Sequence, residues 1–255
     1  MRSLVLTIHL TCAAAATICF WIAGLASKGG SLHRAAGRWF TRLVFLTAWS
    51  GGAMAVARLL VPGLIQVSAD SPIAAAQAVS FERQTMWLVL YVLLIIVAPA
   101  QHGAAVVAAG ATPSRVRSRT HATLTLGAML GSLALIPAAL LWERWLFLII
   151  APIGLIVGFR QLKYATQQTA TPGDWEREHL TSMITAGITL HTALLVFGAT
   201  RTLSLTLHGL PSLLPWSLPA IVGLPVIIWL RRTWRRHADG TPGRAPEVSG
   251  RRMLR

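Results

Sequence analysis

Charged residues are scarce in this chain, and acidic residues are the scarcest. Only 12% of the 255 residues are Asp, Glu, Lys or Arg, which is about half the share found in an average soluble domain. Apolar residues make up 54% of the chain and occur in long blocks. A block of about 18 or more apolar residues predicts a helix that crosses a membrane. The sequence therefore excludes a soluble globular domain and predicts a multi-pass membrane protein.

Cysteine is also nearly absent. Cys12 and Cys19 both fall in the first apolar block. On one helix they would lie about 10 Å apart along the axis, which is too far for a disulfide. The net charge of +15 does not indicate nucleic acid as a partner, because the basic residues lie in short connections and in the C-terminal tail, where membrane topology places them.

Seven apolar blocks are long enough to cross the hydrocarbon core, and they must do so as helices because a lipid-exposed backbone has to bond to itself. We therefore expect an all-α, integral membrane seven-helix bundle. The expected spans are Leu4–Ala26, Trp39–Val61, Thr85–Gly110, His121–Leu141, Trp145–Leu162, Leu180–Thr200 and Leu210–Leu230. Ser71 and Pro72 resemble a helix start, and we expect residues 72–85 to lie along the interface before turning into the third span.

The basic residues predict the orientation of the chain. If the first connection is cytoplasmic, 18 of the 23 Lys and Arg residues lie on the cytoplasmic side, which indicates that the N-terminus faces out and the C-terminus faces in. We expect a bacterial inner (cytoplasmic) membrane protein with one transmembrane domain, 1–237, and a disordered basic tail, 238–255. The basic connections and the tail should contact anionic lipid headgroups. Cleavage of residues 1–26 as a signal peptide is an alternative, although their apolar part is longer than usual.

Histidines are the ionisable residues that the spans do contain, and ionisable residues within spans are functional candidates. His33, His121 and His179 fall at the cytoplasmic ends of three spans, and His102 falls in the cytoplasmic half of another. Four histidines from four helices should thus share one leaflet, with Glu176 and Glu178 nearby. His9 and His191 form a second candidate level.

Imidazole suits zinc, copper and haem iron. Two facing histidines would hold a haem b, with Lys28 and Arg34 pairing with its propionates. Three histidines and a carboxylate would instead suit zinc in a membrane hydrolase, with Glu178 as the catalytic base. The candidate metal ligands are His33, His102, His121 and His179. A hydrogen bond between helices, without a cofactor, is the alternative for each histidine.

The sixth span carries a polar stripe on one helical face. Its members follow a spacing of four and three residues and comprise Glu178, Ser182, Thr185, Thr189 and Thr192. The stripe suggests a path for protons or a small solute, although threonine hydroxyls can also bond to their own helix. Three functions therefore remain open: redox chemistry at a histidine site, transport along the stripe, and zinc-dependent hydrolysis. A purely structural or assembly role is the alternative to all three.

Both ends of the chain resemble an uncharacterised family of bacterial membrane proteins. Residues 9–40, HLTCAAAATICFWIAGLASKGGSLHRAAGRWF, have its early histidine and its K-G-x-x-x-H-R-x-x-G-R loop; residues 178–198 and 214–232, EHLTSMITAGITLHTALLVFG and LPWSLPAIVGLPVIIWLRR, resemble its last two spans. The resemblance implies no reaction. It implies that the family pattern includes His9, Lys28, His33, Arg34, Gly37, His179 and His191. A looser similarity to transmembrane b-type cytochromes implies haem-binding histidines.

Overall fold

The computed structural model describes residues 2–64, 71–171, 173–199 and 213–239, and within these ranges it contains helices and no strand. Seven segments are long and apolar enough to cross a membrane, which confirms the predicted all-α, seven-span architecture of a multi-pass membrane protein. The helices are α1 Arg2–Leu25, α2 Ser31–Leu60, α3 Pro72–Ala109, α4 Arg119–Leu141, α5 Trp145–Ile150, α6 Pro152–Ala165, α7 Asp174–Ala193 and α9 Leu214–Asp239, with the short helices η1 Pro62–Leu64, η2 Pro113–Val116 and η3 Leu194–Ala199.

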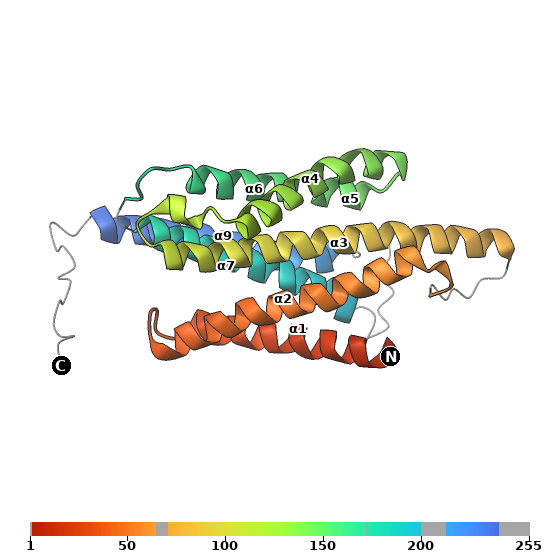
Figure 1. The fold of residues 1–255 in the computed structure, drawn as a ribbon, viewed down its shortest axis with the longest axis horizontal. Helices are drawn as coiled ribbons and strands as arrows, with labels where there is room; N and C mark the ends of the chain where they lie inside the picture. Colours follow the sequence, from red (N-terminus) through yellow and green to blue (C-terminus); the bar gives the residue numbers. More distant parts are fainter. Residues whose placement is uncertain (1, 65–70, 172, 200–212, 240–255) are drawn as a thin grey trace.

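Helix α3 forms the centre of the bundle (Figure 1). It contacts α2 on one side and α4 and α6 on the other, and it packs along α7. Helix α1 pairs with α2, and α9 packs on α7. In the most apolar part of α3, 61% of the residues are buried, against 6% in α9. Connections 26–30 and 110–118, residues 166–171 and the end of α9 lie at one end of the bundle (Figure 1). We call this end the basic end.

Large apolar side chains cover the outside of the bundle. Leu25 and Leu141 are each 82% exposed, and Trp49 is 80% exposed. In water this surface would be strongly unfavourable, whereas in lipid an apolar outer face carries no such penalty. The exposed apolar surface and the lengths of the helices therefore both indicate that the helices lie in a lipid bilayer.

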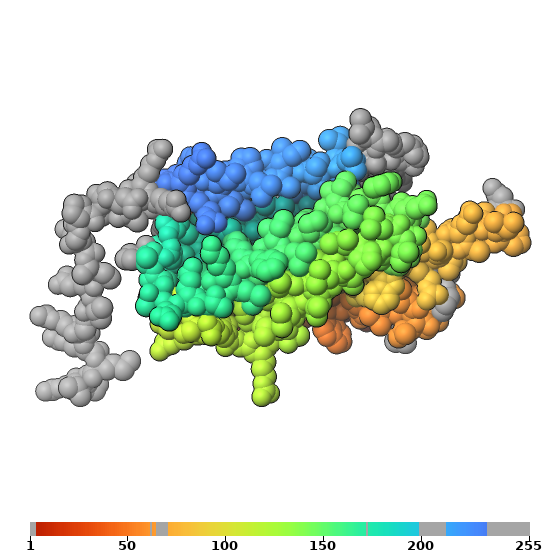
Figure 2. All heavy atoms as spheres, turned by 90° about the horizontal axis from the view of Figure 1, so that it is seen from above, coloured from red at the N-terminus to blue at the C-terminus, as the bar shows by residue number. Residues whose placement is uncertain are grey.

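Several helices begin earlier than expected. Helix α2 begins at Ser31 rather than Trp39, and α7 begins at Asp174 rather than Leu180. Ser71 caps α3 by accepting a hydrogen bond from the amide of Ala74, with Pro72 in the first turn, as predicted. The turn expected near residue 85 is wrong, since α3 runs without interruption from Pro72 to Ala109 and its first turns project beyond the bundle (Figure 2). Helix α9 ends at Asp239, and the predicted tail beyond it lies outside the described residues.

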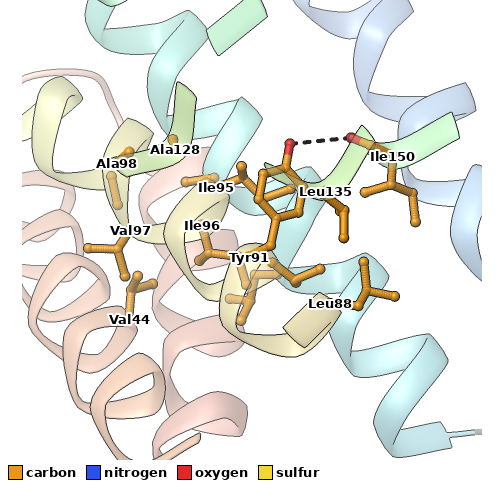
Figure 3. Close-up of a cluster of buried hydrophobic side chains, with 14 of the residues drawn as sticks. Val44, Leu88, Tyr91, Ile95, Ile96, Val97, Ala98, Ala128, Leu135 and Ile150 are labelled. Atoms are coloured by element: carbon orange, nitrogen blue, oxygen red, sulfur yellow. Dashed lines mark hydrogen bonds between the residues drawn. The ribbon is translucent and has the colours of Figure 1, made fainter. Parts of the chain in front are cut away.

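The main apolar core surrounds Tyr91, with Leu88, Ile95 and Ile96 from the same helix (Figure 3). The fifth span breaks into α5 and α6 because Pro152 lacks an amide hydrogen. The Tyr91 hydroxyl lies at this break. It donates to the Ala151 carbonyl at 2.7 Å and accepts from the Gly154 amide at 2.7 Å. The Tyr91 hydroxyl thus satisfies the Gly154 amide, which lies in the first turn of α6 and has no partner within that helix.

Candidate functional site

His102 is fully buried in the half of the bundle toward the basic end, and it connects three helices. Its Nε2 atom lies 3.0 Å from Oε1 of Glu178 on α7, and its Nδ1 atom lies 3.0 Å from Nε2 of His121 on α4. Ser118 caps α4 by accepting a hydrogen bond from the His121 amide, and this cap places His121 in the first turn of its helix. The three side chains form a continuous hydrogen-bonded chain, which we call the Glu–His–His chain.

The chemistry of the three groups determines where its protons lie. An ionised carboxylate only accepts hydrogen bonds, so His102 carries a proton on Nε2 when Glu178 is charged. A neutral His102 then has a lone pair on Nδ1 and accepts the Nε2 proton of His121. A doubly protonated His102 would instead donate from Nδ1 to His121. The direction of the bond between the two rings thus reports whether the chain holds an additional proton.

Arg160 on α6 neutralises the carboxylate of the chain. Its Nη1 atom lies 3.5 Å from Oε1 of Glu178, and its Nη2 group donates to the hydroxyl of Ser182 at 3.1 Å. The side chain of Glu178 is only 9% exposed. A buried carboxylate is strongly destabilising unless a charge and hydrogen bonds compensate it. Arg160 and His102 together supply that compensation.

A second group of polar side chains adjoins the Glu–His–His chain. Thr125, one turn beyond His121 on α4, donates to Oε1 of the fully buried Gln161 at 2.8 Å. The ring of Tyr164 lies edge-on to His102, with 5.8 Å between the centroids. Within the described residues, Nε2 of Gln161 and the hydroxyl of Tyr164 have no hydrogen-bond partner. Helix α6 therefore presents donors that a further polar group could use.

Gly103 allows α3 and α7 to approach closely enough for this arrangement. A Cβ atom at this position would lie 3.0 Å from the terminal methyl of Met183 and 3.1 Å from Cβ of Ser182. The Gly103 carbonyl also accepts a hydrogen bond from Nδ1 of His179 at 2.9 Å. A glycine next to His102 thus brings both Glu178 and His179 against α3.

His33 and His179 form a second pair, separate from the Glu–His–His chain. Their ring centroids lie 6.4 Å apart with the planes at 76°. Nδ1 of His33 donates to the Ala23 carbonyl at 2.9 Å, at the end of α1. The four histidines predicted to share one leaflet are therefore divided into two pairs, and α7 contributes His179 to one pair and Glu178, which bonds to His102, beside the other.

Lys28, in the basic loop after α1, caps that helix, whereas Arg34 bonds to the backbone of the loop. Lys28 donates to the carbonyls of Ala23 and Gly24, and Arg34 donates to the carbonyl of Gly29. Basic side chains at the end of a helix satisfy its last carbonyls and oppose its dipole. Partial burial lowers the pKa of the Lys28 amine below its usual value. In this structure both predicted propionate partners bond to the backbone.

His9 and His191 lie apart from these pairs and bond to different neighbours. Nδ1 of His9 bonds to the Thr47 carbonyl and the Ser50 hydroxyl on α2, at 3.0 and 3.2 Å. Nδ1 of His191 donates to the Gly187 carbonyl at 2.7 Å, and its Nε2 accepts from the Trp21 indole at 3.0 Å. Both nitrogens of His191 are thus occupied, which matches the alternative of helix-to-helix hydrogen bonding.

In the described part of the chain, no three of the predicted metal ligands are arranged so that they could bind one metal ion. No group of three or more His, Cys, Asp or Glu side chains there could hold a metal ion. His102, His121 and Glu178 lie together, but they bond to one another rather than facing a common centre. Haem or zinc binding by the predicted residues, with Glu178 as a catalytic base, stays a prediction.

The threonines of the polar stripe bond mostly to their own helix. Thr185, Thr189 and Thr192 each donate to the carbonyl four residues earlier, at 2.7 to 3.0 Å. Their hydroxyl oxygens keep lone pairs that can accept a proton donor. The stripe thus continues from Glu178 and the buried Ser182 toward the opposite end of the bundle.

Sequence reasoning missed Arg160, Gln161 and Tyr164. Arg160 is one of the basic residues whose distribution predicts the orientation of the chain, but it also lies within the fifth span, and an arginine inside a span is itself a signal of function. A surface hollow of about 390 Å³ lies elsewhere, at the opposite end, where Arg83, Trp87 and Trp142 contribute to its lining. The buried histidines therefore do not adjoin this hollow.

Comparison of the chain with models of protein families, with curated proteins and with solved structures finds no match. The resemblance to an uncharacterised bacterial membrane family, and the looser one to b-type cytochromes, stay predictions. Any reaction or transport activity therefore has to be inferred from the geometry of the buried side chains.

Proposed function

We propose that the chain is a proton transporter that passes protons inside the membrane through Glu178, His102 and His121. The observation that carries the proposal is the position of His102, fully buried and within 3.0 Å of both partners. Chains of Asp, Glu and His within membrane spans commonly serve as proton relays. Of the three functions left open by the sequence, transport is the one that uses this arrangement directly.

The relay can be written so that every proton is accounted for. A proton arriving at Nδ1 of His121 makes that ring doubly protonated. Its Nε2 proton passes to Nδ1 of His102, and the Nε2 proton of His102 passes to the Glu178 carboxylate. Both rings end as neutral imidazoles with the proton on Nδ1, and Glu178 ends as a carboxylic acid. Release of the proton from Glu178, followed by a change of tautomer in each ring from Nδ1–H to Nε2–H, resets the chain.

The polar stripe of α7 supplies a continuation of the path. From Glu178 to Thr192 the stripe extends along about 20 Å of helix, given a rise of about 1.5 Å per residue. Hydroxyl groups both accept and donate, so they can pass a proton without being ionised. Arg160 lies beside Glu178, and its positive charge favours return of the carboxyl group to its ionised form.

We further propose that the protein lies in the cytoplasmic membrane of a bacterium with the basic end inside. The distribution of Lys and Arg supports this orientation. The same residues, on connections and at the end of α9, would then meet anionic headgroups. In this orientation the Glu–His–His chain lies near the cytoplasmic surface, where it can exchange protons with the cytoplasm.

Proton flux in liposomes tests this function. The purified chain is reconstituted with an internal pH dye, and a potassium gradient with valinomycin imposes a potential that is negative inside. We expect acidification well above that of protein-free liposomes. Glu178→Gln, which keeps the size of the side chain but cannot ionise, should reduce the flux to the protein-free level.

Thr41→Val on α2 is the matched control, because the Thr41 hydroxyl bonds to the Gly37 carbonyl of its own helix and lies outside both the Glu–His–His chain and the polar stripe. We expect it to retain most of the flux. Equal losses in the two variants would mean that the loss in Glu178→Gln is not specific to the Glu–His–His chain, which would overturn its role as the proton path. An absence of flux in the wild-type protein would overturn the proposal.

A further inference from the structure

We propose that His33 and His179 form a binding site for a monovalent soft cation, Cu(I), at the basic end. The site is independent of the proton relay, because neither residue belongs to the Glu–His–His chain. The argument rests on the tautomers of the two rings, on their separation and on the charges around them.

Backbone carbonyls determine the tautomer of each ring. Carbonyl oxygens only accept, so His33 and His179 must both carry their proton on Nδ1, toward Ala23 and Gly103 respectively. Each neutral ring then presents the lone pair of Nε2, and neither Nε2 atom has a hydrogen-bond partner among the described residues. Histidines that bind metals are typically held in this way, with the second nitrogen donating to a carbonyl.

The separation of the rings suits an ion shared between them. A metal bound to two imidazoles lies about 2 Å from each nitrogen, so the nitrogens are about 4 Å apart and the ring centroids about 6 Å apart. The observed separation of centroids is 6.4 Å, between rings from two different helices, α2 and α7. Two-coordinate binding by nitrogen ligands is a geometry that Cu(I) and Ag(I) adopt and that Zn²⁺ does not favour.

The surrounding charges favour a monovalent ion. Glu178, which precedes His179, is already paired with His102 and Arg160. The Lys28 ammonium bonds to Ala23, the same residue whose carbonyl accepts from His33. Repulsion from a neighbouring positive charge doubles for a divalent ion. A site with two neutral ligands and an adjacent lysine therefore selects the lower charge.

Met183 adds a soft ligand type to the same region. It lies one turn beyond His179 on α7, so the two side chains occupy neighbouring positions on the helix. Its terminal methyl lies against Gly103, the residue whose carbonyl binds His179. Thioethers and imidazoles are ligands that copper accepts, and thioethers favour Cu(I). The chemical class of the ligand is thus a soft monovalent metal ion.

Silver ion is the probe, since it shares the charge and softness of Cu(I) and does not change oxidation state. Calorimetric titration uses the full chain in detergent and a chloride-free buffer, with Cys12→Ser and Cys19→Ser removing the thiols that would bind silver. We expect one tightly bound ion per chain. His33→Asn and His179→Asn should each weaken binding more than about 10-fold, because losing even a second-shell partner of a metal-binding histidine costs at least that much.

Asparagine keeps an N–H group in place of Nδ1–H and removes the Nε2 lone pair, so these variants preserve the bonds to Ala23 and Gly103. His191→Asn is the control and should leave binding unchanged, because both nitrogens of His191 already have partners. The proposed site would be overturned if His33→Asn or His179→Asn bound silver ion as tightly as the wild-type protein. It would also be overturned if His191→Asn lost as much silver binding as they do. Proton flux in liposomes should be unaffected by His33→Asn, which separates this test from that of the relay.

Discussion

His102 is the residue on which the buried polar network depends. Among the residues that the structure describes, it alone is hydrogen-bonded to both Glu178 and His121, and it is fully buried. Removing one partner of a buried charged pair leaves the other without compensation, which typically costs about 3 to 5 kcal/mol. His191 is different, since it is half-buried and makes two neutral hydrogen bonds.

We expect His102→Leu to destabilise the protein by about 3 kcal/mol and His191→Leu by about 1 kcal/mol. Leucine leaves Glu178 with Arg160 as its one remaining ion-pair partner among the described residues and leaves His121 without its hydrogen bond to His102. Thermal unfolding of the two variants and the wild-type protein in detergent gives the order. A lower midpoint for His191→Leu than for His102→Leu contradicts this account.

The sequence located the important residue types but not their pairing. Histidines could be found because other ionisable residues are rare within the spans. Which histidines meet depends on the rotation of each helix about its axis. The spans are apolar on the face toward lipid and on the face toward protein, so the sequence does not determine that rotation. His33 and His121 were expected in one leaflet, but they belong to different pairs. Arg160 was missed because a positive charge near a span end also has a topological explanation.

At the scale of elements, close packing depends on a few glycines. A Cβ atom on Gly154 would overlap the carbonyl of Ala128 and would lie 2.5 Å from the hydroxyl oxygen of Ser132. The Gly154 amide also bonds to Tyr91. The contact between α4 and α6, at the break that follows α5, thus has no room for a side chain.

We expect Gly154→Ala to destabilise the protein by about 2 kcal/mol or more, because overpacking against backbone forces neighbouring helices apart. Gly127→Ala on α4 is the control, since its Cβ would lie 3.7 Å from Leu94, an ordinary contact. Resistance to unfolding in a denaturing detergent compares the two variants. Equal resistance would mean that α4 and α6 do not pack as described.

The positions of the helices could be predicted from the apolar blocks, whereas the first residues of several helices could not. Helices α2 and α7 begin in polar turns that contain Arg34 and Asp174, and an apolar window does not detect such turns. The expected turn near residue 85 was wrong for a physical reason. Residues 73–98 contain neither proline nor glycine, so nothing interrupts the hydrogen bonding of α3 near residue 85. Pro99 removes one backbone hydrogen bond further along the helix, whose 38 residues extend for about 57 Å.

At the scale of the whole molecule, the account requires the basic end to face the cytoplasm. We expect an impermeant maleimide to label Ser80→Cys, but not Ser114→Cys, in intact bacterial spheroplasts when Cys12 and Cys19 are replaced by serine. Both positions are exposed, on α3 near its start and in η2 respectively. Both should react once the membrane is permeabilised, which serves as the control. The reverse pattern in intact spheroplasts would invert the proposed orientation.

The central claim is that Glu178, His102 and His121 form one hydrogen-bonded chain that holds and passes a proton. The most direct measurement is nuclear magnetic resonance of the protein in lipid with ¹⁵N-labelled histidine. We predict a ¹⁵N–¹⁵N coupling across the bond between Nδ1 of His102 and Nε2 of His121, and a joint change of both rings on titration. Two histidines that titrate independently and show no coupling would contradict the account.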